Sequence, residues 1–442
     1  MVDGTGFFCY TACRMEKQKA TRTVLLSLGL LVAGWFLFHA PAAFALDTAG
    51  VYAPKVGGNV LDQPMLVAGI APVNSTVFVF VDGKLLGATK TVKPKTKKAT
   101  TAAFSFTYKK RIGVGNHTLQ TQVVRGKEKS DWTRQTFIVP KNWPRKLDGM
   151  MVATQYWNQL PYGIMIENTP AARPQAGMSQ ASVVYETLAE GGVTRFLAIF
   201  PQAVRPKSVG PVRSSRPYYV DWAKEYDAIY MHAGGSRDAL NEIGALKVRS
   251  FDGLTRKGAP YVTRKCYGVH CLFTDASRLL KLVQNNKLTN VNAISTGSLF
   301  KSDFTFAQRP NHKKTISIDF NGRTYRVDWT YDRKTNRYYR KNGGVVAKDR
   351  NTGKQINAAN ILVQRVPKEK VLDRKGRISL KLTGKGDATL FRDGQSIAMR
   401  WEKKNASAKT RFFVKSSGKE VEFNRGATWI EVVPGTRKVT YK

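Results

Sequence analysis

The chain of 442 residues is too long for one compact core, and 42% hydrophobic with 23% charged residues excludes a chain that is disordered throughout. Its 72 Lys and Arg against 31 Asp and Glu give a net charge of +41, of which +21 lies in residues 301–442. Such a field attracts polyanions, which include nucleic acid, anionic lipid headgroups and anionic wall polymers. A basic surface that is simply solvated is the alternative.

The first 45 residues have the three-part layout of an export signal. A basic stretch at 15–22 precedes the apolar run VLLSLGLLVAGWFLF at 24–38, and small residues lead to a cleavage-type site that ends at Ala45. An uncleaved membrane anchor is the alternative, because an apolar stretch of about 20 residues can cross a bilayer. Both interpretations place the rest of the chain outside the cytoplasmic membrane. Since the pattern begins at Met15, either Met1 or Met15 is a candidate start.

The cysteines do not indicate a disulfide scaffold. Cys9 and Cys13 precede the apolar run. Cys266 and Cys271 follow it, and they either close a short loop or stay as free buried thiols. No second Cys or His pair stands at zinc-ligand spacing, so we expect no metal site and no cofactor.

Residues 46–140 predict a small β-sandwich. Alternating stretches such as STVFVFVDGKLLG and GNHTLQTQVVRG are bounded by turn signals at 82–83 and 115–116. Several strands in about 90 residues are typical of a sandwich, and the segment resembles the bacterial immunoglobulin-like modules that serve exported proteins as spacers or adhesive units. The five lysines of residues 90–101 indicate a basic solvated loop.

Residues 148–300, after a linker at 140–149, predict an α/β domain in which strands alternate with helices. We expect strands at 162–167, 193–200 and 227–232, and helices at 179–190, 217–226 and 237–246. Pro217 suits the first turn of its helix because its missing N–H costs nothing there, and Ser236 has the place of an N-cap.

Residues 313–442 predict an all-β domain of short strands with hairpin signals at 342–343 and 393–394. The expected fold class is therefore a multidomain α+β chain with an immunoglobulin-like β-sandwich, a central α/β domain and a C-terminal all-β domain. Tyr338 and Trp401 are among the C-terminal aromatics that alternate with Arg and Lys, as do those of nucleic-acid platforms. A half-buried strand shows the same alternation, so we interpret these residues and Trp429 as core, and nucleic acid as the weaker partner.

Four long stretches carry a family resemblance. YGIMIENTPAARPQAGMSQASVVYETLAEGGVTRFLAIF and VGPVRSSRPYYVDWAKEYDAIYMHAGGS, followed by GDATLFRDGQSIAMRWEK and GATWIEVVP, resemble the YerB-like family, whose members share domain of unknown function 3048. The resemblance implies an α/β domain over about residues 148–295 and a β-rich domain over about 313–436. It also implies an exported or membrane-attached envelope protein without an assigned activity.

Two features depart from the family pattern. Lipoprotein members carry an acylated cysteine, whereas no cysteine follows the apolar run here, and the immunoglobulin-like module is an addition. In VHCLFT the family histidine is kept as His270, but Cys271 stands where the family has an amide.

Ligands of α/β folds gather beyond the carboxyl ends of strands, where several polar residues of this chain are expected. The sequence AGGS before a helix offers backbone N–H groups to an anion, and two arginines offer planar forks suited to phosphate or carboxylate. The candidate ligand-binding residues are Asn168, Arg173, Arg195, Arg213, Ser214, Arg216, Gly234, Gly235 and Ser236. The candidates for acid or base catalysis are Glu167, His232 and His270.

Each candidate has a purely structural alternative. The AGGS segment is then a capped turn, Arg213 and Arg216 pair with Glu186 or Glu190, and the histidines are satisfied core residues. No GxSxG elbow or HExxH motif is present, and no spacing pairs a nucleophile with a base.

The leading hypothesis is an exported or membrane-anchored envelope protein. Its α/β domain binds a small anionic ligand, a lipid headgroup or an anionic polymer, and its basic β domain attaches to anionic surface material. One alternative is an envelope enzyme that acts on a phosphate-containing or wall-precursor substrate. The other is an adhesive or scaffold protein in which residues 46–140 carry the function.

Overall fold

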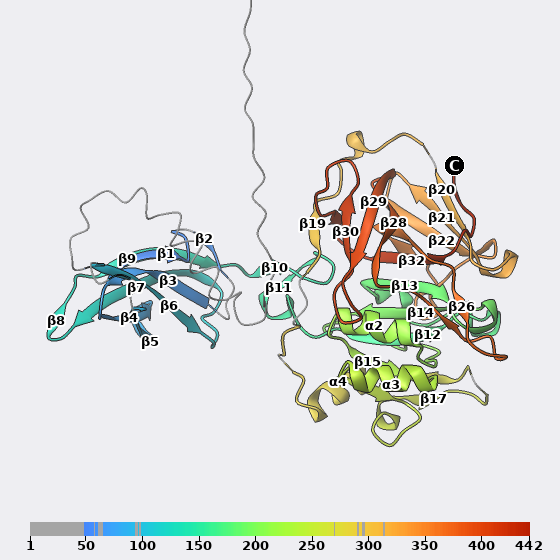
Figure 1. Ribbon diagram of the computed structural model, residues 1–442, viewed down its shortest axis with the longest axis horizontal. Coiled ribbons are helices and arrows are strands. Elements are labelled where there is room, and N and C mark those ends of the chain that lie inside the picture. The colour runs from blue at the N-terminus through green and yellow to red at the C-terminus, as the bar shows by residue number, and fades with distance from the viewer. Residues whose placement is uncertain are drawn as a thin grey trace, which may run out of the picture. The chain divides into compact units, whose positions relative to one another are not determined.

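The computed structural model describes residues 48–442 except 57, 61–64, 93–95, 97–98, 269, 290, 294–296 and 313. The expected export signal or membrane anchor in residues 1–45 lies outside the described residues. The chain divides into two compact units with the boundary between Lys141 and Asn142, and both consist mainly of strands (Figure 1). Within the described ranges, no helix has the length and apolarity needed to cross a membrane.

The first unit contains two sheets that contribute to one core. One sheet has the order β1 (Gly50–Ala53), β3 (Met65–Pro72), β6 (Thr101–Tyr108). The other has the order β2 (Gly58–Asn59), β9 (Thr133–Val139), β7 (Gly115–Arg125), β4 (Thr76–Val81), β5 (Lys84–Lys90), with β8 (Glu128–Lys129) paired to β7. Every second residue of β4 is buried, which is the alternation of a half-buried strand. The immunoglobulin-like classification of this unit stays a prediction.

Turn signals in this unit have two outcomes. Asp82 and Gly83 both adopt positive φ in the hairpin between β4 and β5, as expected. The expected turn at 115–116 is wrong, because Gly115 and Asn116 begin β7 and pair with the end of β9. Cross-strand pairing therefore overrides the local turn preference of this dipeptide.

The second unit is built around a ten-stranded mixed sheet (Figure 1). Its order is β16 (Ser250–Asp252), β15 (Ile229–His232), β12 (Tyr162–Glu167), β14 (Thr194–Phe200), β13 (Val183–Leu188), β32 (Thr428–Pro434), β25 (Asn360–Val366), β28 (Gly384–Arg392), β29 (Gln395–Lys403), β30 (Arg411–Val414). The helices of this unit are α2 (Pro217–Glu225), α3 (Arg237–Ala245) and α4 (Ala276–Asn285). Strands of the central and C-terminal segments thus form one continuous sheet, because β32 pairs in parallel with β13.

The helix expected at 179–190 is wrong. A short 3₁₀ turn at Met178–Gln180 is followed by strand β13, which pairs with β14 on one edge and β32 on the other. All residues of β13 are buried. A strand that is covered on both faces does not alternate between apolar and polar residues. Its sequence therefore lacks the period of two residues by which a half-buried strand is recognised, and it can be mistaken for a helix. The other five expected elements of the central segment are confirmed, and the Ser236 hydroxyl accepts a hydrogen bond from the Ala239 N–H at the start of α3.

A second sheet of the same unit has the order β23 (Val345–Val346), β22 (Arg337–Asn342), β21 (Arg326–Asp332), β20 (Thr315–Asp319), β33 (Val439–Tyr441), with β24 (Asn357–Ala358) paired to β22. Four short pairs complete the strands: β10 (Asn142–Pro144) with β11 (Met151–Ala153), β17 (Thr263–Arg264) with β18 (Leu272–Phe273), β19 (Leu299–Lys301) with β31 (Glu422–Asn424), and β26 (Lys370–Val371) with β27 (Ile378–Ser379). The hairpin signals at 342–343 and 393–394 are confirmed as turns between β22 and β23 and between β28 and β29.

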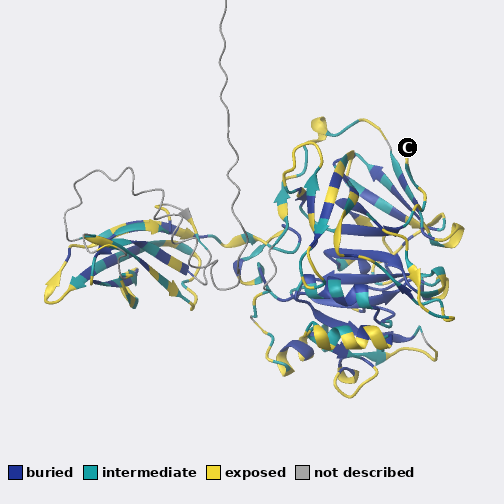
Figure 2. Ribbon diagram, in the orientation of Figure 1, coloured by how far each residue is buried: buried dark blue, intermediate teal, exposed yellow. Residues whose placement is uncertain are grey.

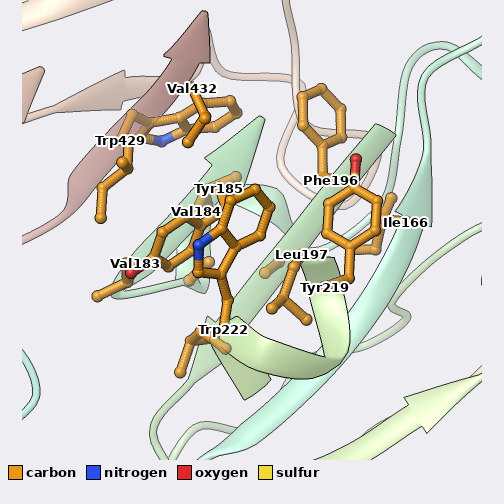
Figure 3. Packing of buried hydrophobic residues seen from close by; sticks show 14 of the residues in the cluster. Ile166, Val183, Val184, Tyr185, Phe196, Leu197, Tyr219, Trp222, Trp429 and Val432 are labelled. Carbon is orange, nitrogen blue, oxygen red and sulfur yellow. The ribbon is translucent and has the colours of Figure 1, made fainter. Parts of the chain in front are cut away.

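The core of this unit lies on both faces of the central strands, which Figure 2 shows as almost continuously buried. On one face Trp222 of α2 stacks on Tyr185 of β13 with ring centroids 4.6 Å apart (Figure 3). On the other face the ring of Trp429 in β32 contacts that of Trp329 in β21 at 5.0 Å. Trp429, Tyr338 and Trp401 are all buried, which confirms that these aromatics are core residues.

Candidate functional site

The carboxyl ends of β12 and β15 bring the candidate residues together. These strands run parallel, and the segment that carries Arg213 to Arg216 lies beside both ends. The Arg213 N–H donates to the Met165 carbonyl oxygen, and the Ser215 N–H donates to the Gly234 carbonyl oxygen. Residues of three separate stretches of sequence therefore meet at one edge, as expected for ligand sites of sheets with parallel strands.

Glu167 and His270 form a hydrogen-bonded pair at this edge. His270 Nδ1 lies 2.6 Å from Glu167 Oε2, and the Arg213 Nε lies 3.1 Å from the same oxygen. The Glu167 side chain is only 2% exposed, whereas those of Arg213 and His270 are 25% and 33% exposed. A buried carboxylate thus holds two groups that reach solvent, an arrangement that fixes the orientation of an imidazole.

Glu190 holds the other two arginines. Its carboxylate lies 2.8 Å from Arg195 and 2.6 Å from Arg216. Burial by itself raises the pKa of Glu190, but the two guanidinium groups outweigh it and lower this pKa to about 2. The ion pair with Arg216 is the structural alternative that the sequence left open, and the pair between Arg213 and Glu167 was not foreseen.

The cluster of three arginines and two carboxylates has an excess of positive charge. Glu167 of β12 and Arg195 of β14 are direct cross-strand neighbours, which links the two halves of the cluster. Burial, together with repulsion from Arg195 and Arg216, lowers the pKa of Arg213, although Glu167 and Glu190 oppose that change. These five side chains therefore carry one more positive than negative charge.

Asn168 and Arg173 have mainly structural contacts. The Asn168 amide donates to Glu186 Oε1 and to Thr194 Oγ1, and its oxygen accepts from Arg173 Nε. Arg173 also donates to the Thr324 carbonyl oxygen, so it ties the loop after β12 to the second sheet. Asn168 is 1% exposed, and Arg173 is partly exposed.

The AGGS turn and His232 are occupied by contacts within the fold. The Gly234 N–H donates to Asp252 Oδ1 at 2.8 Å, which takes up one of the backbone groups proposed for an anion. His232 is 1% exposed, with Nδ1 2.8 Å from the Gly234 carbonyl oxygen and Nε2 2.7 Å from Ser250 Oγ. Burial lowers the pKa of His232. Of the three acid or base candidates, Glu167 and His270 contact each other, whereas His232 contacts Gly234 and Ser250. Ser214 and Gly235 are partly exposed, and Gly235 pairs with Ser215.

A buried charged triad that the sequence did not predict links the two sheets of the second unit. Arg340 of β22 donates to Glu186 of β13 and to Glu431 of β32, the second at 3.0 Å, and all three side chains are buried. Burial and repulsion from Glu186 raise the pKa of Glu431 to about 8. A glutamate inside each of two otherwise uncharged strands is the signal that could have revealed the triad, since such charges need a buried partner.

Cys266 and Cys271 form a disulfide in the loop between β17 and β18, directly beside His270. Of the two alternatives that the sequence left open, the bridge is therefore the one found. Cys271 is buried, whereas Cys266 is exposed.

Comparison with known families identifies the class of protein. Residues 147–289 match the N-terminal domain, and residues 316–430 the C-terminal domain, of the proteins of unknown function called DUF3048. The two models together cover more than half of the chain, so this protein belongs to the DUF3048, or YerB-like, family. The resemblance drawn from the sequence motifs is confirmed.

A curated protein and a solved structure, both named YerB and both from Bacillus subtilis, are similar to about two thirds of this chain. "Putative lipoprotein YerB" of Bacillus subtilis (strain 168) is 32% identical over 292 residues, which cover 65% of this chain and 85% of the relative. The crystal structure of YerB protein from Bacillus subtilis matches with a TM-score of 0.59 and 28% identity, over 68% of this chain and 99% of that one.

Proposed function

We propose that this protein is an extracytoplasmic envelope protein that binds a phosphate- or carboxylate-bearing ligand at the cluster of Arg195, Arg213, Arg216, Glu167, Glu190 and His270. The envelope location is supported by the export-signal pattern of residues 1–45 and by the similarity to a protein named as a lipoprotein. The ligand chemistry is supported by the excess of arginine over carboxylate in the cluster.

The partly exposed side chain of Arg213, with 25% of its surface accessible, is the single observation that carries the proposal. Arg195 and Arg216 are almost fully buried against Glu190. They would therefore attract an anion through their positive charge and would not bind it by direct hydrogen bonds. Arg213 reaches solvent next to His270, and a planar guanidinium can bind a phosphate or carboxylate through two parallel hydrogen bonds. An incoming anion would therefore meet Arg213 and His270 first.

Calorimetric titration of the full chain with inorganic phosphate and with glycerol phosphate, at low salt, tests this site. Arg213→Gln is expected to weaken binding at least tenfold, a loss of about 1.4 kcal/mol. Arg134→Gln, which removes an exposed charge on β9 of the first unit, is the matched control and should change affinity less than twofold. Equal losses in both variants, or none in either, would remove the support for a specific site.

A second candidate function is catalysis of phosphate-ester hydrolysis. It is favoured by one observation, the Glu167 carboxylate that orients His270 through Nδ1 and leaves the imidazole partly exposed for proton transfer. Turnover of a panel of phosphate esters should then be abolished by His270→Ala, while phosphate binding through Arg213 persists. A wild-type chain that binds phosphate but turns over none of the esters rejects this function and leaves the binding proposal intact.

A further inference from the structure

A cavity of about 700 Å³ lies on the outer side of the sheet formed by β20 to β24, away from the cluster around Arg213. It is lined by polar and aromatic residues that include His312, Thr330, Asp332, Tyr339, Lys341 and Gln355. Its volume is in the range of sites that hold small ligands, about 300–1,000 Å³.

Strand alternation explains why these side chains are available. On β22 the side chains of Tyr338, Arg340 and Asn342 are buried, so the intervening Tyr339 and Lys341 point to the outer face. Tyr339 lies directly opposite Thr330 of β21. The ring of Tyr339 and the hydroxyl of Thr330 therefore form neighbouring parts of one surface.

Several polar groups of the cavity are held in place by the fold. The Gln355 amide donates to the Arg340 carbonyl oxygen at 2.8 Å, and His312 Nε2 lies 3.2 Å from the Gly394 carbonyl oxygen. The Tyr339 hydroxyl donates to Thr335 Oγ1 at 3.3 Å. A ligand would therefore contact an aromatic ring and polar groups that the fold already holds in place. Binding would then cost little conformational entropy, because few side chains need to be ordered.

The cavity is lined by two cationic side chains, Arg333 and Lys341, and by one carboxylate, so its net charge is positive. Lys341 is exposed, and its cross-strand neighbour Asp328 accepts hydrogen bonds from Ser317 and Arg326. The one lining carboxylate, Asp332, accepts from the Lys334 N–H and the Thr335 hydroxyl of its own turn. The surrounding segment of residues 301–442 carries +21. An acidic ligand is thus favoured over a neutral or cationic one.

We propose that this cavity is a binding site for an acidic oligosaccharide. The ring of Tyr339 provides a flat apolar surface for one face of a sugar, and Lys341 provides the partner for its acidic group. His312 and Gln355 provide hydrogen-bonding groups for hydroxyls at the rim. The site is separate from the cluster around Arg213, and it is independent of the function proposed there.

Titration of the full chain with tetragalacturonic acid tests the site, with neutral cellotetraose as the matched uncharged probe. The expected result is binding of the acidic tetramer and at least tenfold weaker binding of the neutral one. Tyr339→Ala and Lys341→Gln are each expected to weaken binding of the acidic tetramer about fivefold or more. Every titration uses the Arg213→Gln chain, so that the carboxylates of the probe cannot bind at the other cluster, and the exposed charge change Lys375→Gln should leave the affinity unchanged within twofold.

Three outcomes would overturn the proposal. The first is no binding of tetragalacturonic acid at low salt, and the second is an equal affinity for cellotetraose. The third is an equal loss of affinity for tetragalacturonic acid in Lys341→Gln and Lys375→Gln. Such a result would show that the net positive charge of the protein attracts the probe and that no specific site binds it. Because Tyr339 is partly buried, its variant is checked by thermal melting, and the exposed Lys341→Gln variant decides the result if Tyr339→Ala does not fold.

Discussion

His270 Nδ1 and Glu167 Oε2 lie 2.6 Å apart, although 103 residues separate them in the sequence. The carboxylate ends strand β12, and the imidazole belongs to the disulfide-closed loop that precedes β18. Arg213 uses the same carboxylate oxygen, at 3.1 Å. Glu167 therefore fixes the orientation of the imidazole, and it also partly neutralises the positive charge of Arg213.

Glu167→Gln is expected to strengthen phosphate binding, by about three- to tenfold. Removing the carboxylate takes away the negative charge that partly neutralises Arg213, and the amide still fits the same space. Titration calorimetry with inorganic phosphate measures the change. If the protein is instead a phosphate esterase, the same variant loses turnover, so affinity and rate move in opposite directions. Weaker phosphate binding in a folded variant would contradict the proposed site.

Removal of the disulfide is expected to affect both stability and the site. Cys266→Ser with Cys271→Ser opens a cross-link that spans 5 residues in sequence, and loop-closure entropy predicts a loss of about 2 kcal/mol in the free energy of unfolding. Because His270 adjoins Cys271, phosphate affinity should fall as well. Urea denaturation and titration measure the two effects. Dithiothreitol should reproduce them in the wild type and do nothing further to the double variant.

Arg340→Met is expected to destabilise the protein by about 3–5 kcal/mol. The substitution leaves Glu186 and Glu431 buried side by side without their cation, and a buried charge without a partner is costly. Chemical denaturation followed by tryptophan fluorescence measures the loss. Adding Glu186→Gln should restore part of it at neutral pH, because Glu431 keeps its proton there and the unpaired carboxylate of Glu186 is then removed. A change below about 1 kcal/mol in the single variant would contradict the importance of the triad.

The stability of the protein should fall between pH 5 and pH 8 through Glu431. An unperturbed glutamate releases its proton near pH 4.5, whereas burial and Glu186 raise the pKa of Glu431 in the folded protein to about 8. The folded state binds the proton more tightly, so the contribution is fully present below about pH 4.5 and is lost as the pH rises to about 8. Urea denaturation at several pH values measures the slope. Glu431→Gln should flatten the wild-type slope across this window, and parallel slopes would show that Glu431 ionises normally.

Local sequence signals predicted many elements of the second unit correctly. The Ser236 cap, the first-turn position of Pro217 and the hairpin at 393–394 depend on contacts within a few residues, and all are found. Strand β13 was mistaken for a helix because its sequence lacks the period of a half-buried strand. Its identity depends on β14 and β32 covering both edges.

For the candidate site, the sequence determined which residue types are present, namely arginines and a glycine-serine turn after strands, and the family motifs that contain them. Only the tertiary structure decided their partners: Glu190 for Arg195 and Arg216, and Glu167 for Arg213 and His270. The buried Arg340 between Glu186 and Glu431 was likewise decided by the packing of distant strands. The physical reason is that an ion pair is specified by distance and burial, which depend on sheet order, while a cap or a hairpin turn is specified by the backbone of a few consecutive residues.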